Sequence, residues 1–393
     1  MTRPTAPDAS ASARPAGRSY LDAGGAAPLH PLALEALRQA SVEGWSNPER
    51  LHSEARTAAT LLGAARETFA ALVGARTQEV HLTPSHVASL HAAVTAVAPA
   101  RRRVGRGVVA SAVERAAVLA AARHVAGDDG VTLVPTDRLG RVDAHAMADA
   151  VAQPGVGLSC LQHANGEVGT VQPLAVVHEA ARVARVPLLV DAGASIGHAQ
   201  VPSSWDVLAA DPADWGAPRG VGLLVVRQGV RVARTGPEDA DPWAPGGVNV
   251  ANAFAAAVVL KAVMAERQET AARLSVLVDR LRGEVPRLVP DVEVVGDPDE
   301  RLPHVLTFSC LYVDGEALLT ELDRHGFAVG SGSACTSLTL EPSHVLRAMG
   351  VLTHGNVRLT LHPGVTSDDV DRFLAVLPGC VARVRDQLGV RGL

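Results

Sequence analysis

The chain alternates short apolar runs with longer segments in which apolar residues recur at helical spacing. Within residues 55–73, for example, Leu62, Ala65 and Phe69 fall on one face of a helix. The runs that we predict to be strands are 108–112, 131–135, 156–160, 187–190 and 221–226. Strands without polar positions are buried on both faces, and helices between them favour parallel pairing. The pattern therefore predicts an α/β domain with a mostly parallel sheet sandwiched by helices.

The pattern changes near residue 251, where two long helices are predicted at 251–266 and 270–285. The shorter segments that follow are 292–295, 304–310, a helix at 315–325, 328–330, 357–361 and a last helix from 367. This mixture predicts a smaller α+β C-terminal domain. We therefore divide the chain into a large domain, 20–258, and a small domain, 259–393. Residues 1–19 are rich in Pro, Ala and Ser and are predicted to be a disordered tail.

Composition excludes several classes of protein. The net charge of −5 gives no electrostatic reason to expect nucleic acid or an anionic membrane as a partner. No apolar run reaches the length of a membrane span, and the N-terminal segment lacks the apolar core of a signal peptide. The four cysteines form no CxxC pair, so we expect neither a disulfide framework nor a zinc site. A reducing cytoplasm is the expected location.

Lysine is almost absent from the chain. Of the 36 basic residues, 35 are arginine and one is Lys261. GC-rich coding explains a preference for arginine, but any lysine-dependent chemistry must still use Lys261. That residue falls inside a helical pattern, and a solvated helix face is the reading we favour.

A Gly/Ser-rich stretch at residues 330–338 contains Cys335. Such a sequence is typical of an exposed loop, whereas the other three cysteines lie in apolar contexts. A thiol in a loop is accessible, and the thiolate is the reactive form. We favour a nucleophile or sulfur carrier at Cys335 over a small residue without a role.

Asp191 ends the predicted buried strand Leu188-Leu-Val-Asp. A carboxylate at the C-terminal end of a parallel strand points into the crevice where α/β folds bind ligands. An aspartate there is equally typical of a helix N-cap. The residues alone leave both readings open.

Several motifs resemble those of the NifS/IscS-like cysteine desulfurases, which belong to the class V aminotransferases of fold type I. The matching stretches are Tyr20-Leu-Asp-Ala-Gly-Gly-Ala-Ala-Pro, Ser46-Asn-Pro with Leu51-His, Gln162-His-Ala-Asn-Gly-Glu-Val-Gly-Thr-Val-Gln, Val190-Asp-Ala, Ser331-Gly-Ser-Ala-Cys-Thr-Ser, Leu340-Glu-Pro-Ser-His-Val-Leu-Arg-Ala-Met-Gly and Gly355-Asn-Val-Arg. They occur in the family's order between residues 20 and about 378.

The resemblance implies a seven-stranded, mostly parallel sheet and the removal of sulfur from L-cysteine. In this family a lysine holds pyridoxal 5′-phosphate (PLP) as an imine, and the cofactor ring acts as the electron sink. A loop cysteine accepts the sulfur as a persulfide. Carried over by position, Asp191 pairs with the pyridinium nitrogen and Asn165 lies beside the ring. Arg358 then binds the substrate carboxylate, and Cys335 is the nucleophile.

The positions that hold the cofactor in the family depart from its pattern. At the positions of the family's lysine, histidine and serine, this chain has Asp214, Ala213 and Asp211. In the phosphate-binding turn it has His86 and Val87. Three further positions differ: Arg115 replaces the stacking histidine, Ala194 replaces the glutamine of V-D-A-A-Q, and Gly246-Gly247 replaces the Gly-Thr pair. Asp211 and Asp214 put carboxylates where the phosphate and the aldehyde of the cofactor should lie, and like charges repel. A drift from lysine to arginine would not have produced Asp214. We therefore expect PLP to be absent or not covalently bound, with Asp191 and Asn165 as vestigial contacts.

Three hypotheses follow from this pattern. The first is a degenerate desulfurase-like protein that relays sulfur on Cys335. The second is an active PLP-dependent desulfurase or lyase that binds PLP without the lysine, and the third is a structural heterodimer partner of an active paralogue. Retention of Cys335 and Arg358 favours the first. We expect a homodimer or a heterodimer with a paralogue, a sulfur-acceptor protein as partner, and no metal, because Asp211, Asp214 and His86 match no known ligand spacing.

Overall fold

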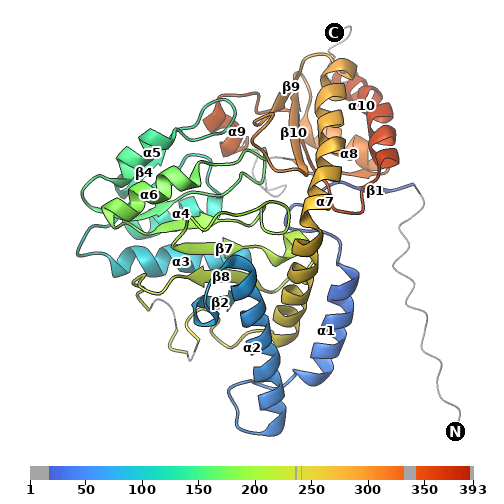
Figure 1. The fold of residues 1–393 in the computed structure, drawn as a ribbon. Helices are drawn as coiled ribbons and strands as arrows, with labels where there is room; N and C mark the ends of the chain where they lie inside the picture. Colours follow the sequence, from blue (N-terminus) through green and yellow to red (C-terminus); the bar gives the residue numbers. More distant parts are fainter. Residues whose placement is uncertain (1–16, 235–236, 240, 332–341, 390–393) are drawn as a thin grey trace, which may run out of the picture.

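The computed structural model describes residues 17–234, 237–239, 241–331 and 342–389, and its largest sheet has seven strands (Figure 1). Their order is β2-β8-β7-β6-β5-β3-β4, and their bounds are β2 Val80–Thr83, β3 Gly107–Ser111, β4 Val131–Val134, β5 Val156–Cys160, β6 Leu188–Asp191, β7 Val207–Ala210 and β8 Gly222–Val226. Strands β7, β6, β5, β3 and β4 pair in parallel, whereas β8 is antiparallel to β7 and β2. The predicted α/β fold with a mostly parallel sheet is confirmed.

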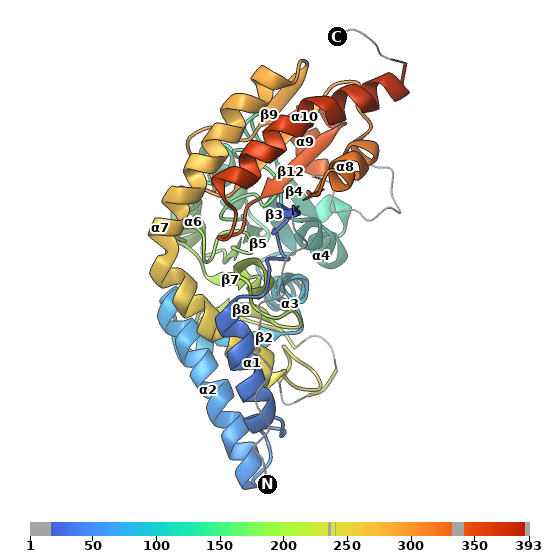
Figure 2. The ribbon, with the colours of Figure 1, turned by 90° about the vertical axis from the view of Figure 1, so that its right-hand side faces the viewer.

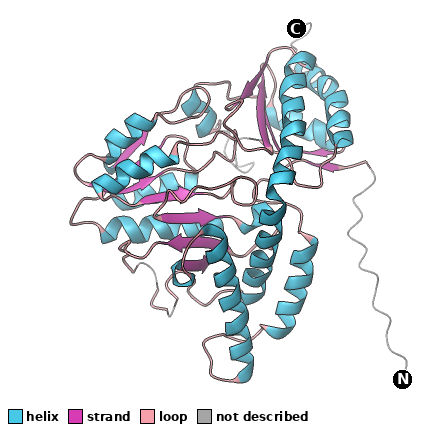
Figure 3. Ribbon diagram, in the orientation of Figure 1, coloured by secondary structure: helices cyan, strands magenta, loops and turns pink. Residues whose placement is uncertain are grey.

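Both faces of this sheet are covered by helices (Figure 3). Successive strand residues point to opposite faces, so Val109 and Val190 join one apolar cluster while Val108 and Leu189 join the other. The first cluster is completed by α2 Ser53–Val73, α5 Ala144–Val151, α6 Leu174–Ala184 and α7 Val250–Leu288, and the second by α3 His86–Ala100 and α4 Ala116–Ala126. Burial on both sides explains why the strands read as unbroken apolar runs.

The C-terminal part forms an apolar cluster of its own around an antiparallel sheet of order β12-β10-β9. Its elements are β9 Val292–Val295, β10 Val305–Cys310, α8 Gly315–Arg324, β11 Phe327–Ala328, α9 His344–Met349, β12 Asn356–Thr360 and α10 Ser367–Gln387. Phe308, Phe327 and Phe373 are fully buried in it. The smaller α+β domain is therefore present as predicted from the pattern.

One helix, α7, contributes residues to the first cluster of the large sheet and to the C-terminal cluster. Helix α7 is 39 residues long and begins at the cap Asn249, whose Oδ1 accepts a hydrogen bond from the Asn252 amide at 3.0 Å. It packs against α1 (Pro31–Glu43) and α2 at one end and against α10 and β9 at the other (Figure 2). Residues up to Leu260 belong to the first cluster and residues from Leu274 to the C-terminal one. The two separate helices expected here are wrong, because helical hydrogen bonding continues through 267–269.

Two further expectations need correction. The predicted tail, 1–19, extends too far: Ser19 lies in β1 (Ser19–Tyr20), pairs in parallel with β11 and is buried against Asp369, with 2.6 Å between Oγ and Oδ1. Strands β2 and β7 were not predicted, because the first is only Val-His-Leu-Thr and the second ends in two alanines. Both gain their stability from pairing with neighbours and not from a strong local pattern.

Among the residues that the structure describes, no helix combines the length and the apolar composition of a membrane span.

The C-terminal core should depend strongly on Phe308, which is fully buried in the central strand β10. Phe308→Ala should lower the free energy of unfolding by roughly 3–5 kcal/mol, because it removes buried apolar surface and leaves a cavity. The matched control is Leu51→Ala, at a side chain that is 91% exposed, for which we expect a change within about 0.5 kcal/mol. Urea unfolding followed by circular dichroism measures both, and equal losses would contradict the assignment of the core.

Candidate functional site

A buried carboxylate stands at the C-terminal end of β6. Asp191 is 4% exposed, and its Oδ1 accepts a hydrogen bond from the Gly193 amide at 2.8 Å. His86 Nε2 lies 2.9 Å from the same oxygen, and Arg115 Nε donates to Oδ2 at 2.9 Å. Burial alone would raise the pKa of Asp191, but the charges of His86 and Arg115 outweigh it and hold that pKa well below its usual range. Asp191 caps none of the described helices, and its position in a ligand-binding crevice stays a prediction.

His86 is placed by the start of α3. Ser85 caps this helix, its Oγ accepting from the Ala88 amide at 3.1 Å, so that His86 is the first helical residue. The imidazole is 3% exposed and lies against Gly193: a Cβ at that glycine would be 2.3 Å from His86 Cε1. Its Nδ1 is 4.0 Å from Asp211 Oδ2. The ring therefore fills the space over Gly193, between two carboxylates.

Arg115 reaches Asp191 from the turn between β3 and α4. The preceding residue, Glu114, is buried, and its Oε1 accepts a hydrogen bond from the Gln162 amide at 2.7 Å. Burial raises the pKa of Glu114 to about 8. The two neighbours thus differ in function: Arg115 supplies charge to Asp191, and Glu114 is held protonated near neutral pH.

Asp214 lies on a short 3₁₀ turn, η3 (Pro212–Trp215), and is 4% exposed. Its Oδ1 accepts from the Gly25 amide at 2.8 Å, and its Oδ2 lies 3.1 Å from Nε2 of His198. Asp211 caps the same turn, and burial raises its pKa. The three residues weighed as a metal set do not share one centre, since His86 faces Asp191 and Asp211 while Asp214 faces His198.

Asn165 is buried and its amide is used by the backbone. Its Oδ1 accepts from the amides of Glu167 and Val168 at 2.8 and 2.9 Å, and its Nδ2 donates to the Val113 carbonyl at 3.1 Å. These bonds hold the turn after β5. A contact from Asn165 to a cofactor stays a prediction.

Arg358 lies on β12 and pairs with Asp22, Nη2 to Oδ1, at 2.8 Å. Its backbone exchanges two hydrogen bonds with Gly330, at 2.8 and 3.0 Å, which fixes the start of the cysteine stretch beside it. Cys335 itself lies outside the described residues. On the other side of that gap, His344 Nε2 is 2.8 Å from the Glu114 carbonyl oxygen. Binding of a substrate carboxylate by Arg358 stays a prediction.

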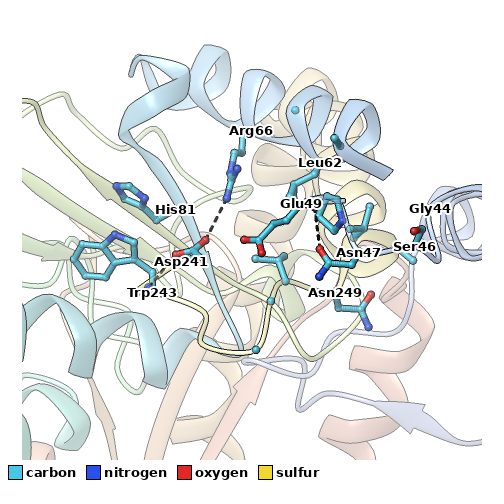
Figure 4. Close-up of a pocket in the computed structure, with 18 of the residues that line it drawn as sticks. Gly44, Ser46, Asn47, Glu49, Leu62, Arg66, His81, Asp241, Trp243 and Asn249 are labelled. Atoms are coloured by element: carbon cyan, nitrogen blue, oxygen red, sulfur yellow. Dashed lines mark hydrogen bonds and ion pairs between the residues drawn. The ribbon is translucent and has the colours of Figure 1, made fainter. Parts of the chain in front are cut away.

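A large cavity lies elsewhere (Figure 4). It has a volume of about 1120 Å³ and is lined by the 44–49 turn, Arg66, Asp241, Trp243 and the Gly246-Gly247 pair. Arg66 Nη2 is 3.4 Å from Asp241 Oδ2 across it. None of the residues around Asp191 lines this cavity. We therefore base the candidate site on the buried charges and not on cavity size.

Comparison with known proteins decides the family. Residues 19–373 match the family described as Aminotransferase class-V. The chain belongs to this family, among the cysteine desulfurases. It is 33% identical to the Cysteine desulfurase IscS of Dictyoglomus turgidum, over 93% of this chain and 95% of that one. It is 35% identical to the IscS-like cysteine desulfurase of Mycobacterium tuberculosis, over 93% and 97%. The family resemblance predicted from the motifs is confirmed.

Solved structures agree on the fold of this desulfurase relative. A NifS-like protein superposes with a TM-score of 0.84 at 24% identity, covering 95% of this chain and 99% of the other. DndA from Streptomyces lividans superposes with a TM-score of 0.73 at 28% identity, covering 87% and 99%. The family is PLP-dependent, so PLP is the cofactor against which the site has to be compared.

Sequence reasoning missed two histidines of this region, His198 and His304. They are 7% and 1% exposed, and their rings stack with centroids 3.8 Å apart. Neither stands in a motif that carries chemistry in the family pattern, and only the fold brings them beside Asp214. An aspartate at a lysine position was the available signal that this pocket had changed.

The raised pKa of Glu114 should make stability fall as pH rises. In the unfolded chain its pKa is about 4.5, and in the folded chain about 8. Between these values the unfolded state releases a proton that the folded state keeps, which favours unfolding. Glu114→Gln removes this effect and keeps the acceptor for the Gln162 amide. Its stability relative to the parent protein should therefore increase steadily from about pH 5 to about pH 8.

Urea midpoints at several pH values measure that difference. The control, Glu67→Gln, removes the same kind of charge from an exposed position on α2. A difference between Glu114→Gln and the parent protein that does not change with pH would contradict a buried, protonated Glu114.

Proposed function

We propose that this protein is a member of the cysteine desulfurase family that works without PLP and relays sulfur through Cys335. The observation that carries the proposal is the occupation of Asp191 by side chains of the chain itself. In the family this carboxylate pairs with the pyridinium nitrogen. Here a ring nitrogen of His86 and the Arg115 guanidinium take its two oxygens, each at 2.9 Å.

The fit of PLP to this pocket is poor for a steric reason as well. The imidazole of His86 lies against Gly193, so closely that a single added carbon would be 2.3 Å from it. A cofactor ring on the Asp191 carboxylate would have to displace His86 from a place where it is 3% exposed and charge-paired. Burial of an unpaired Asp191 would then be costly.

Acidic side chains in the pocket also disfavour binding of the cofactor's phosphate and aldehyde groups. Asp211 and Asp214 place two carboxyl groups next to Gly25 and His86, and Val87 offers no hydroxyl. A phosphate needs donors from a turn and a helix N-terminus, and here the first residue of α3 turns its side chain to carboxylates instead. Lys261, the single lysine, is exposed on α7. We therefore derive no step through PLP.

Sulfur relay requires only thiol chemistry. The Cys335 thiolate attacks the outer sulfur of a donor persulfide, R–S–SH, and forms Cys335–S–SH while the donor leaves as the thiolate R–S⁻, which takes up a proton from water. The new S–S bond replaces the one that breaks, so no oxidant is needed. A second exchange passes the sulfur to an acceptor thiol. An active desulfurase or a small persulfide would be the donor, and a sulfur-acceptor protein the recipient, in the cytoplasm.

The two other hypotheses remain distinct from this one. A PLP enzyme without the lysine would have to bind the cofactor by displacing His86. A structural subunit paired with an active paralogue would need neither Cys335 nor the Asp191 pocket. The pairing of Asp191 with His86 and Arg115 disfavours the first alternative, and both homodimer and heterodimer are compatible with sulfur relay.

The purified protein should be colourless and should show no pyridoxal absorption when PLP is added in excess. The cause is that His86 and Arg115 already hold Asp191. Visible spectroscopy during a PLP titration, followed by borohydride trapping and mass spectrometry, measures this. Asp214→Lys alone should not restore desulfurase activity, because His86, Val87 and Arg115 remain.

The positive control for this titration is the Mycobacterium tuberculosis relative at 35% identity. A second variant, His86→Gly combined with Asp214→Lys and Arg115→His, tests whether the pocket can be reopened. Pyridoxyl trapped on any residue of the unmodified protein would refute PLP independence.

Cys335 should be the fastest of the four cysteines to be alkylated and the one that accepts persulfide sulfur. Cys160, Cys310 and Cys380 are buried. Burial raises the pKa of Cys310 to about 12 and that of Cys380 to about 11, and it also raises the pKa of Cys160. Those thiols are therefore protonated and slow near neutral pH. Peptide mass spectrometry after timed iodoacetamide treatment, or after incubation with a persulfide donor, gives the order.

Cys335→Ser is the control, and it should abolish the sulfur adduct while leaving the folded protein unchanged. Equal labelling of all four cysteines, or undiminished sulfur transfer by Cys335→Ser, would contradict the sulfur relay through Cys335. The hypothesis of a structural heterodimer partner would then be favoured.

A further inference from the structure

Two histidines and an aspartate from distant parts of the chain meet behind the Asp191 pocket. His198 comes from the turn after β6, Asp214 from η3, and His304 from the residue before β10. All three are buried, with exposures of 7%, 4% and 1%. One donor atom from each lies within 4.8 Å of the others.

Several polar atoms of this cluster have no hydrogen-bond partner. These are both ring nitrogens of His304 and Oδ2 of Asp214. Buried polar atoms are nearly always hydrogen-bonded, and leaving one unpaired is destabilising. Asp214 Oδ1, in contrast, is bound by the Gly25 amide, which turns Oδ2 toward His198. The unpaired atoms therefore converge on one small volume.

We propose that His198, Asp214 and His304 bind a divalent first-row transition-metal ion such as Zn²⁺. Two imidazoles and one carboxylate are a donor set that zinc and iron sites use, with further positions left open. Bound to an ion, His304 and Asp214 would gain the partner that they lack. The inference concerns a separate centre and does not rest on the absence of PLP or on the role of Cys335.

The spacing of the donors is compatible with one ion after a small closure. Two ligands at about 2.1 Å from a tetrahedral ion are about 3.4 Å apart. His198 Nε2 and Asp214 Oδ2 are already 3.1 Å apart. The histidine rings are stacked, with planes at 20°, so one of them must rotate to aim its nitrogen at the ion.

His304 offers a neutral imidazole, the form that a metal requires. Burial, reinforced by the neighbouring His198, holds the pKa of His304 well below its ordinary value, so its lone pair is free at neutral pH. Asp214 adds a carboxylate oxygen to the donor set, 3.1 Å from His198 Nε2. The same nitrogen also lies 3.3 Å from the Asp214 carbonyl oxygen, a contact that an ion would replace.

A cavity of about 250 Å³ adjoins the cluster and provides an open side. His198 and Asp214 lie in its wall, together with Pro28, His30 and Val263. A metal held by three protein ligands needs such a space for water or a small ligand. The cavity also gives the ion a way in.

Metal binding can be tested on the full chain without any activity assay. The protein is treated with a chelator, desalted and titrated with Co²⁺, followed by visible absorption, and with Zn²⁺, followed by calorimetry. A Cys335→Ser background removes the Cys335 thiol as a ligand. We expect one ion per chain, a rise in melting temperature with added Zn²⁺, and a loss of affinity of roughly 100-fold or more in Asp214→Asn and in His304→Gln.

Two controls make the result specific. His325→Gln alters the other cluster of metal-binding residue types in the described chain, Glu321, His325 and Cys380, and should leave binding unchanged. His163→Gln alters a different buried histidine, 4% exposed, and should do the same. If His304→Gln does not fold, the isosteric Asp214→Asn still decides the question.

Absence of binding in the unmodified chain overturns the proposal. So does equal affinity in all variants, or a loss that follows His325 and not Asp214. In those cases the cluster is a hydrogen-bonded His198–Asp214 pair with a neutral His304 stacked on it.

Discussion

The negative charge of Asp191 is the constraint around which the candidate site is arranged. The parallel sheet delivers this carboxylate to the end of β6, where it is nearly inaccessible to water. A buried charge needs partners, and here they come from the first residue of α3 and from the turn before α4. Arg115, Asp191, His86 and Asp211 then follow one another through the pocket, so that basic and acidic side chains alternate. The desulfurase scaffold is thus retained with a charge balance that the protein supplies by itself.

Much of the fold followed from the sequence, because long helices and strands buried on both faces leave a clear apolar pattern. Strands β3, β4, β5 and β6 and the C-terminal α+β part were predicted in this way. Strand β7 was missed because Val-Leu-Ala-Ala gains its place only by pairing with β6 and β8. The single helix α7 was read as two, since a short polar stretch on an exposed face resembles a break.

The site was predictable only in part. Family motifs located Asp191 and drew attention to His86, Arg115 and Asp214 as departures from the pattern. They could not show that His86 and Arg115 turn to Asp191, because that depends on distances between segments far apart in the chain. His198 and His304 gave no signal at all in the sequence, since each is an ordinary residue until the turn after β6 and the strand β10 meet. Departures at several positions of one pocket were the sign that its chemistry had changed as a unit.

Helix α7 also determines how the two halves of the molecule can move. At 1.5 Å per residue its 39 residues extend about 58 Å. Val263 and Met264 still pack against the core of the large domain, whereas none of residues 265–273 is buried. A shaft of continuous hydrogen bonds replaces the flexible linker that usually joins two domains. A rotation of one core relative to the other therefore bends or twists this helix, and the stiffness of the helix resists that motion.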